Sequence, residues 1–456
     1  MKADPSEAQA FLDANPQIEA FDLVLIDANG IARGKIIRRH ELMGVYTHGR
    51  HLPISILGLD ILGEDVEATG LVWDEGDADR RAWPLPGALK PLHGTNRGEV
   101  QVSLYELDGA PMTSDPRHAL AAQVQALAEQ GLRASGAFEL EFFLLEPELG
   151  PDGKVVAARD VLDGRAGRRT DVYSVDALHG MLPFLDDVYA AARLSDLPAE
   201  TAISEYAPGQ FELTLHYRDD VLQAADDLCR LKRIVRAMAR KHGRLACFMA
   251  KPHEDRAGSG MHFHVSLWQG ARNILVEDQE GQWNAPLRHA IGGLAATMGE
   301  AMLVFAPHAN SWRRFVGNSY APVKPTWGVN NRSVALRIPA GSKSARRIEH
   351  RPSGVDANPY LVAAVVLAGI RQGLAQGIDP GPETTGNGYA DSPLSGAPTL
   401  PRDWREAIEA ARGSDFLKAA LGEGLHRTFL AVIGAEYARV AREVSELDLR
   451  LYLQTV

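Results

Sequence analysis

The stretch "GAFELEFFLL" (residues 136–145) decides how this chain folds. Successive side chains of a β-strand point to opposite faces, so Glu139 and Glu141 share one face, with Phe143 following them. Two carboxylates on one face of an apolar strand are costly when the face is buried. Either this face is solvated, or a cation lies between the two carboxylates.

Composition limits the class of protein. The 456 residues are 45% hydrophobic and 23% charged, as in ordinary globular domains, and the net charge of −11 disfavours nucleic acid and membrane surfaces as partners. The charged first residues lack the apolar core of a signal peptide, and the longest apolar run, 361–370, is too short to span a bilayer. Cys229 and Cys247 are the only cysteines, which excludes a disulfide framework. We therefore expect a cytoplasmic protein without a membrane or nucleic-acid partner.

Turn and capping signals divide the chain. Residues 21–38 predict a hairpin around Asn29 and Gly30, and residues 99–107 predict a further strand. The stretch 108–116 is typical of a linker, and Asp115 and Pro116 begin a helix that ends at Gly131. Further strands are expected at 136–145, 209–216, 261–268, 333–339 and 346–351, and helices at 222–242 and 358–377. The pattern predicts an α+β fold with a small N-terminal domain, 1–112, and a large domain, 113–456.

Charged residues recur on the predicted strands of the large domain. They are Glu139, Glu141, Glu205, Glu212, His262, His264 and Glu349. Taken singly, a strand histidine is more often a hydrogen-bonded core or edge residue, and a strand glutamate is usually solvated. Five carboxylates with one or two imidazoles are an oxygen-rich set, which suits Mg²⁺ or Mn²⁺ better than structural zinc. The spacing therefore indicates a candidate divalent-metal site.

A second group of residues is rich in arginine. Its members are Arg314, Arg332, Arg337, Arg346, Arg347 and Arg351. They could form a basic face that balances the acidic total. Metals together with several arginines are also typical of phosphoryl transfer, because two anions about 4 Å apart repel by about 4 kcal/mol at an effective dielectric near 20. The sequence has no Walker A loop, GxGxxG or GxSxG motif, so the common nucleotide and hydrolase signatures do not help.

Five motifs in order resemble those of the glutamine synthetase family. They are "GAFELEFFLL" (136–145), "EYAPGQFEL" (205–213), "GSGMHFHVSLW" (258–268), "NRSVALRIP" (331–339) and "ARRIEHRPSGVDANPYL" (345–361). The resemblance covers nearly the whole chain. It implies a β-grasp-like N-terminal domain and a catalytic domain built on a curved antiparallel sheet with flanking helices. Two metals that each hold one of Glu139 and Glu141 would remove the like-charge conflict on that strand.

The resemblance also implies roles for individual residues. One metal would be held by Glu141, Glu205 and Glu212, and a second by Glu139, His262 and Glu349, with two or three Mg²⁺ or Mn²⁺ ions per subunit. Nucleotide-binding positions would be Glu200, His264, Ser266, Arg332 and Arg347. Substrate-binding positions would be Gly258, Arg314, Arg337 and Arg351. Arg332, Arg337 and Tyr320 would be the catalytic residues.

The implied chemistry has two steps. ATP phosphorylates the γ-carboxylate of glutamate, and an amine then displaces phosphate. The resemblance further implies a homo-oligomer, a dodecamer of two hexameric rings, in which residues near 50–60 of one subunit face the catalytic strands of the next.

Three positions depart from the family pattern. Tyr320 replaces the flap glutamate that takes the ammonium proton, Pro53 replaces the aspartate that helps to bind ammonium, and Ala257 replaces a common asparagine. The departures are either drift in loops or an ammonium site rebuilt as an aromatic pocket for an organic amine, to which Trp312 and Trp327 would contribute. We favour the rebuilt site, as in the γ-glutamylpolyamine and γ-glutamylamide synthetases of polyamine catabolism and nitrogen metabolism.

Several alternatives stay open. True glutamine synthesis is disfavoured by the two missing carboxylates. A family member that has lost catalysis and serves a structural or regulatory role is disfavoured because all six metal ligands remain. A polyamine would favour an acidic residue deep in the pocket, for which Asp60, Glu64 and Asp65 are candidates. Tyr389 is near where some family members carry an adenylylated tyrosine, but the surrounding residues differ, and we favour an ordinary loop tyrosine.

Overall fold

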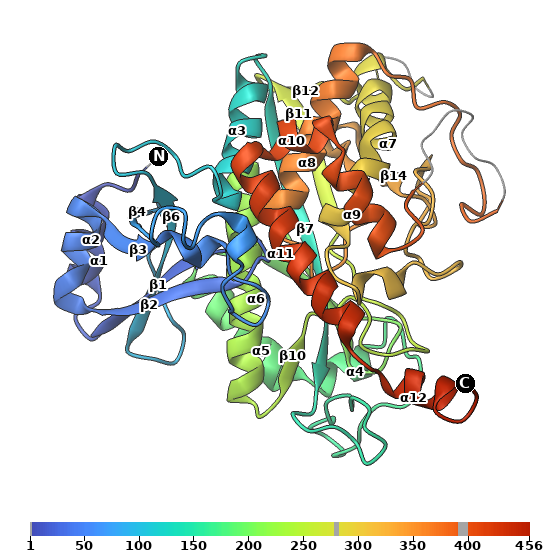
Figure 1. Cartoon of the computed structure of the whole chain (residues 1–456), viewed down its shortest axis with the longest axis horizontal. Coiled ribbons are helices and arrows are strands. Elements are labelled where there is room, and N and C mark those ends of the chain that lie inside the picture. The colour runs from blue at the N-terminus through green and yellow to red at the C-terminus, as the bar shows by residue number, and fades with distance from the viewer. Residues whose placement is uncertain (1, 278–281, 391–399) are drawn as a thin grey trace.

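The computed structural model describes residues 2–277, 282–390 and 400–456, which form two sheets covered by helices (Figure 1). The helices are α1 (Pro5–Ala14), α2 (Leu42–His48), α3 (Pro116–Ala128), α4 (Val175–His179), α5 (Leu182–Leu194), α6 (Val221–Lys241), α7 (Ala285–Phe305), α8 (Pro359–Gln376), α9 (Trp404–Arg412), α10 (Asp415–Leu421), α11 (Glu423–Arg442) and α12 (Glu446–Tyr452).

The strands are β1 (Ala20–Ile26), β2 (Ala32–Arg38), β3 (Arg50–Pro53), β4 (Asp79–Pro84), β5 (Lys90–Pro91), β6 (Arg97–Tyr105), β7 (Arg133–Leu145), β8 (Ala199–Ser204), β9 (Gln210–Leu215), β10 (Leu245–Cys247), β11 (Phe263–Gln269), β12 (Arg272–Asn273), β13 (Trp327–Val329), β14 (Leu336–Ile338) and β15 (Ile348–His350). These bounds confirm the expected hairpin, and they shorten the strands expected at 333–339 and 346–351 to three residues each.

The N-terminal sheet has the order β2-β1-β6-β4-β3, with β5 beside β6. The predicted hairpin pairs Ala20 with Arg38 across β1 and β2, while β1 and β6 run parallel. A parallel pair at the centre with antiparallel neighbours is the β-grasp-like arrangement that was expected. Helices α1 and α2 cover this sheet and lie at the left of Figure 1.

The larger sheet has the order β13-β14-β15-β11-β7-β9-β8. Its pairs are antiparallel except β13 with β14, which run parallel. The thirteen-residue strand β7 pairs with β11 through Phe138 and with β9 from Glu139 onward. The predicted antiparallel sheet with flanking helices is therefore confirmed, with one parallel pair at its edge.

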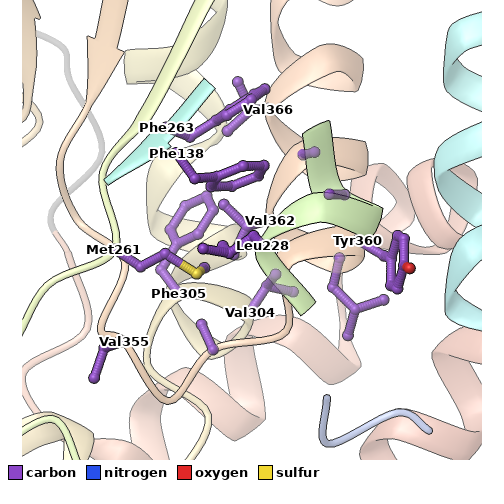
Figure 2. Close-up of a cluster of buried hydrophobic side chains, with 14 of the residues drawn as sticks. Phe138, Leu228, Met261, Phe263, Val304, Phe305, Val355, Tyr360, Val362 and Val366 are labelled. Carbon is purple, nitrogen blue, oxygen red and sulfur yellow. The ribbon is translucent and has the colours of Figure 1, made fainter. Parts of the chain in front are cut away.

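The apolar face of β7 packs into the main core. Phe138 stacks on Phe263 of β11 with ring centroids 4.5 Å apart, and Figure 2 shows both rings in a cluster with Val362 and Val366 of α8. Helix α8 begins where its cap was predicted, because the Asn358 side chain accepts a hydrogen bond from the backbone of the second residue. Burial of this face turns the alternate side chains, Glu139 among them, toward the opposite face of the sheet.

The two sheets are joined through the start of α8. The Asn358 side chain donates hydrogen bonds to the carbonyls of Asp27 and Ala28 at 2.9 and 3.2 Å, at the end of β1. Helix α3 begins at Pro116 with Asp115 as its cap, as predicted. The division of the chain at residue 112 stays a prediction. Among the described residues, no helix is long and apolar enough to cross a membrane.

Candidate active site

Three carboxylates lie close together, on Glu141 of β7, Glu212 of β9 and Glu205 just before β9. Glu141 lies directly opposite Glu212 in the strand register, and Glu205 precedes the turn into β9. Burial, followed by the charges of Glu139 and Glu141, raises the pKa of Glu212 to about 10. Burial and the charge of Glu141 raise the pKa of Glu205 to about 7. Ionising all three carboxylates would therefore bring like charges together in a poorly solvated site.

Glu139 lies between two imidazoles. Its Oε2 is 2.7 Å from Nδ1 of His262, and its Oε1 is 2.8 Å from Nε2 of His264. Burial opposes ionisation, but the charge of His264 and the hydrogen bond with His262 hold the pKa of Glu139 well below its usual range. The two histidines reach this carboxylate because they are two residues apart on β11, beside β7.

Glu349 on β15 is held by two arginines. Arg337 donates to its Oε2 at 2.6 Å, and Arg351 donates to its Oε1. Burial alone would raise the pKa of Glu349, but the charges of His264 and Arg351 outweigh burial and lower this pKa to about 2. The β11–β15 register places Glu349 opposite His264, which carries it to the cluster. A carboxylate with this pKa is ionised at every physiological pH.

The cluster fits a divalent metal. Ligand atoms of Glu139, His264 and Glu349 lie within 4.8 Å of one another, and so do those of Glu139, Glu212 and His262. Carboxylate oxygens with a minority of imidazole suit Mg²⁺ or Mn²⁺. Burial and the neighbouring carboxylates raise the pKa of Glu212, and a cation bound here would relieve their repulsion.

This grouping differs from the expected one. Glu139 belongs to both sets, and Glu212 joins Glu139 and His262 instead of Glu141 and Glu205. Glu141 is in neither of these two sets, and its Oε2 accepts a hydrogen bond from the Gly260 backbone at 2.7 Å. Four of the six predicted metal ligands, Glu139, Glu212, His262 and Glu349, therefore lie in these two sets, and Glu141 and Glu205 lie near enough for their charges to affect the set. Their partition between ions stays a prediction.

Two of the predicted glutamate-binding residues, Arg314 and Gly258, lie in closely packed surroundings. The buried Arg314 guanidinium donates to the carbonyl of Pro352 at 2.8 Å. A side chain at Gly258 would meet the Ala250 carbonyl at 2.5 Å, and one at Gly260 would meet Nη2 of Arg314 at 2.8 Å. Only glycine allows the backbone to approach the guanidinium this closely.

The predicted nucleotide-binding residues are only partly assembled. Arg347 donates to Nδ1 of His264 at 3.1 Å, and Arg332 lies close enough to Glu205 for its charge to lower that pKa. Ser266 on β11 accepts a hydrogen bond from Trp268. Glu200 lies on β8, where it pairs with His216, and among the described residues no hydrogen bond or ion pair joins Glu200 to the cluster.

The predicted aromatic pocket is partly wrong. Trp327 is 1% exposed in the main core, and Trp312 packs against the same core and donates to the Ala306 carbonyl. Tyr320 is instead 47% exposed, and its ring lies 5.4 Å from that of Tyr206, which is 39% exposed. Both indole side chains pack against the core because they have the largest apolar surfaces in this segment.

Other candidate residues lie elsewhere. Asp60 and Glu64 both accept hydrogen bonds from Arg439 of α11, which leaves neither as an unpaired acid beside Tyr320, and Asp65 bridges to Leu59. Pro53 ends β3 in the N-terminal sheet, Ala257 packs beside Phe143, and the Tyr389 hydroxyl donates to the Ala321 carbonyl. Within one chain these residues do not form an acidic amine pocket.

Sequence reasoning missed three residues that shape the site. Tyr206 pairs with Tyr320, Gln210 donates to the carbonyl of Gly258 at 2.9 Å, and Asn330 accepts from Arg337 at 2.9 Å. Tyr206 and Gln210 lie inside the motif that contains Glu205, so the motif itself could have indicated that they lie near the site. Nothing in the local pattern around Asn330 points to its contact.

Comparisons with known proteins agree with this geometry. Residues 113–452 match the family model described as glutamine synthetase, catalytic domain. The chain is 36% identical to γ-glutamylputrescine synthetase PuuA of Escherichia coli (strain K12), over 98% of this chain and 94% of that protein. It is 29% identical to a glutamate–isopropylamine ligase of a Pseudomonas species, over 87% and 85% of the two chains.

A solved structure titled "GmaS/ADP complex-Conformation 1" has a TM-score of 0.84 at 26% identity and covers 99% of this chain and 100% of that chain. The chain is also 31% identical to a glutamine synthetase of Mycobacterium tuberculosis (strain ATCC 25618 / H37Rv), over 94% of each chain. The family predicted from the five motifs is confirmed, and this chain belongs to the glutamine synthetase family.

Proposed function

We propose that this enzyme joins the γ-carboxylate of glutamate to an organic primary amine at the expense of ATP, releasing ADP and phosphate. The observation that carries the proposal is the exposed Tyr206–Tyr320 pair beside Glu205, at the flap position where a family member that uses ammonium needs a carboxylate. The names of two relatives, a γ-glutamylputrescine synthetase and a glutamate–isopropylamine ligase, support the same reaction class.

The six acidic and imidazole residues would hold the metal ions that ATP requires. They are Glu139, Glu141, Glu205, Glu212, His262 and Glu349. Bound Mg²⁺ or Mn²⁺ would neutralise phosphate oxygens and orient them for transfer. The pKa values of Glu205 and Glu212 are raised to about 7 and about 10, and a cation held there would favour the ionised form of both carboxylates.

The reaction proceeds through an acyl phosphate. A γ-carboxylate oxygen of glutamate forms a bond to the terminal phosphorus of ATP, and the bond from that phosphorus to ADP breaks. The amine nitrogen then forms a bond to the γ-carbon, the carbon–oxygen bond to phosphate breaks, and the nitrogen loses one proton. Phosphorylation comes first because a carboxylate is a poor acyl donor until one of its oxygens becomes a good leaving group.

The arginines would bind the anions of this reaction. We assign Arg314 and Arg351, with the Gly258 backbone, to glutamate, and Arg337 and Arg332 to the transferred phosphoryl group. Arg337 and Arg351 both pair with Glu349 in this structure, so their positive charge is already concentrated at the cluster. Glu200, His264, Ser266 and Arg347 would contact the nucleotide.

Glutamine synthesis from ammonia is the second candidate, favoured by 31% identity to a glutamine synthetase over 94% of the chain. Tyr320 and Pro53 argue against it, because neither supplies a negative charge at neutral pH to bind ammonium.

We also propose that the protein forms a ring-shaped homo-oligomer, a dodecamer of two hexameric rings, with β3 of one subunit near the catalytic strands of the next. Activity should disappear on dissociation, which light scattering with parallel assays would detect. A fully active monomer would contradict this assembly. A cytoplasmic location stays a prediction from composition.

A screen of amines tests the proposed reaction. Phosphate release should require ATP, glutamate and a primary amine together, and mass spectrometry should find the γ-glutamyl amide. Release with ammonium alone among the nitrogen donors would overturn the proposal.

A further inference from the structure

One buried glutamine contacts several parts of the site that are far apart in the sequence. Gln210 begins β9 and is 1% exposed. Its Nε2 donates to the Gly258 carbonyl at 2.9 Å and lies 3.2 Å from the Ser259 hydroxyl. The same nitrogen lies 3.4 Å from Oε2 of Glu141. These partners are 48, 49 and 69 positions away along the chain. A buried amide is costly unless it is hydrogen-bonded, so these contacts hold the three segments together.

The orientation of this amide is fixed by the turn that precedes β9. The Ala207 backbone N–H donates to Oε1 of Gln210 at 3.2 Å, and the Gln210 backbone N–H donates to the Ala207 carbonyl at 2.9 Å. The Gln210 carbonyl accepts from the Glu205 backbone at 2.9 Å. Because the amide oxygen faces this turn, the two N–H groups of the amide nitrogen face the segment 258–260. One side chain therefore links the turn that carries Glu205 to that segment.

The Gly258 carbonyl depends on this side chain for its donor. The neighbouring Ser259 amide donates to the Ala250 carbonyl at 2.8 Å, and the Ser259 carbonyl accepts from the Val355 backbone at 3.1 Å. Among the residues that the structure describes, no backbone N–H donates to the Gly258 carbonyl. Backbone bonds thus hold Ser259, whereas the direction of the Gly258 carbonyl depends on Gln210.

This carbonyl suits one end of the glutamate substrate. A glycine backbone offers its carbonyl oxygen to a cationic ligand, and that oxygen has two lone pairs. It can therefore accept from Gln210 and from the α-ammonium group of glutamate at the same time. Position 257, where the family commonly has asparagine, is Ala257, whose side chain offers no hydrogen bond of its own.

We propose that Gln210 is a positioning residue for glutamate, whose amide directs the Gly258 carbonyl toward the α-ammonium group and ties that contact to Glu141. The inference rests on the proposed glutamate–amine ligation and adds to it a residue that acts through Gly258. An acceptor that is already oriented needs no ordering when the ligand arrives, which strengthens binding. Loss of the amide nitrogen should therefore weaken the binding of glutamate and leave the binding of ATP and the amine unchanged.

Two variants of similar length test this role while retaining the packing. Gln210→Met removes both N–H donors, and Gln210→Glu replaces the amide nitrogen by an oxygen that faces the Gly258 carbonyl. In both, KM for glutamate should rise by about tenfold, the order of one lost hydrogen bond to a binding group. KM for ATP, KM for the amine and kcat should stay within about threefold, because the contact is present before and during the reaction. Calorimetry of glutamate with the enzyme in Mg²⁺ and ADP should show the same loss of affinity without turnover.

The matched control is Gln123→Met. Gln123 is another buried glutamine, 5% exposed, and it donates to the Ala420 carbonyl at 2.8 Å, between α3 and α10. This variant should leave KM for glutamate unchanged, even where its Tm falls as far as that of the Gln210 variants.

An unchanged KM for glutamate in both Gln210 variants would overturn the inference while leaving the ligase reaction intact. Equal rises in KM for glutamate, ATP and the amine would also overturn it, because they would assign Gln210 a general structural role. If the intact enzyme released no phosphate with glutamate and any organic amine, the proposed function itself would fail, and this inference with it.

Discussion

The carboxylate cluster on the sheet and the exposed Tyr206–Tyr320 pair beside it are built in opposite ways. In the cluster, strand register fixes half-buried glutamates on β7 and buried ones on β9 and β15, with Glu141 opposite Glu212 and His264 opposite Glu349. In the Tyr206–Tyr320 pair, the exposed rings are carried on loops, and Tyr320 has a left-handed backbone with a φ of 61°. Strand pairing fixes the positions of the carboxylates in the cluster, whereas a few hydrogen bonds hold the tyrosine pair.

This difference separates two tasks of a ligase. Phosphoryl transfer depends on dense charge in a water-poor site, which rigid strands supply. The choice of amine depends on surfaces that can change without disturbing that charge, and loops supply them. Removing a carboxylate should therefore abolish turnover, whereas altering a tyrosine should change which amine is used.

The largest effect is expected from the cluster. Glu141→Ala or Glu205→Ala should lower ATP turnover at millimolar Mg²⁺ by at least about 10³-fold, because charge stabilisation of the phosphoryl group would be lost. Phosphate release measures the loss, and circular dichroism checks the fold. Glu148→Ala, an exposed glutamate shortly after β7, is the matched control and should be fully active. Turnover that persists in both site variants would break the metal assignment.

The second effect concerns an aromatic residue that the sequence placed in the amine pocket. Trp327→Ala should lower the free energy of unfolding by about 3–5 kcal/mol, because Trp327 is 1% exposed in the core. Tyr320→Ala should change it by less than about 1 kcal/mol, because that side chain is half exposed. Urea titration measures both values. Equal losses would mean that the flap tyrosine belongs to the core as well.

A smaller effect is the pH dependence of the metal-free protein. Glu205 and Glu212 have folded pKa values of about 7 and about 10, above the ordinary value of 4.5. Below pH 4.5 their contribution to stability is complete, and it is lost as the pH rises through about 7 and about 10, because the folded chain binds more protons than the unfolded chain in that window.

In a chelator, Tm should therefore fall by several degrees between about pH 6 and about pH 8.5, and added Mg²⁺ should restore it increasingly as the pH rises. Glu212→Gln should flatten the metal-free profile. A Tm that rises with pH in the chelator would contradict the assigned direction.

The sequence predicted the elements that depend on local pattern. The alternation in β7, the caps of α3 and α8 and the hairpin β1–β2 are set by neighbouring residues, and all were found. The gathering of Glu139, His262 and Glu349 was expected through resemblance, and the strand register explains it physically. Their roles as metal ligands stay predictions.

Contacts between distant segments could not be predicted in the same way. Tyr206 meets Tyr320, which lies 114 positions further along the chain, and no periodicity around either residue points to that contact. Trp312 and Trp327 were expected in the pocket because they are close in sequence to Tyr320, yet the core offered their indoles more apolar contact. The parallel pairing of β13 with β14 likewise depends on a chain reversal that has no local signal.

The central claim is that the site beside Glu205 takes an organic amine in place of ammonium. At fixed pH, kcat/KM for 1,4-diaminobutane should exceed that for ammonium chloride by at least about 10²-fold, because burial of each methylene contributes about 0.8 kcal/mol and no flap carboxylate binds ammonium. Tyr320→Glu should narrow this ratio by improving the use of ammonium. Efficient glutamine formation from ammonium, with no organic amine preferred, would contradict the account.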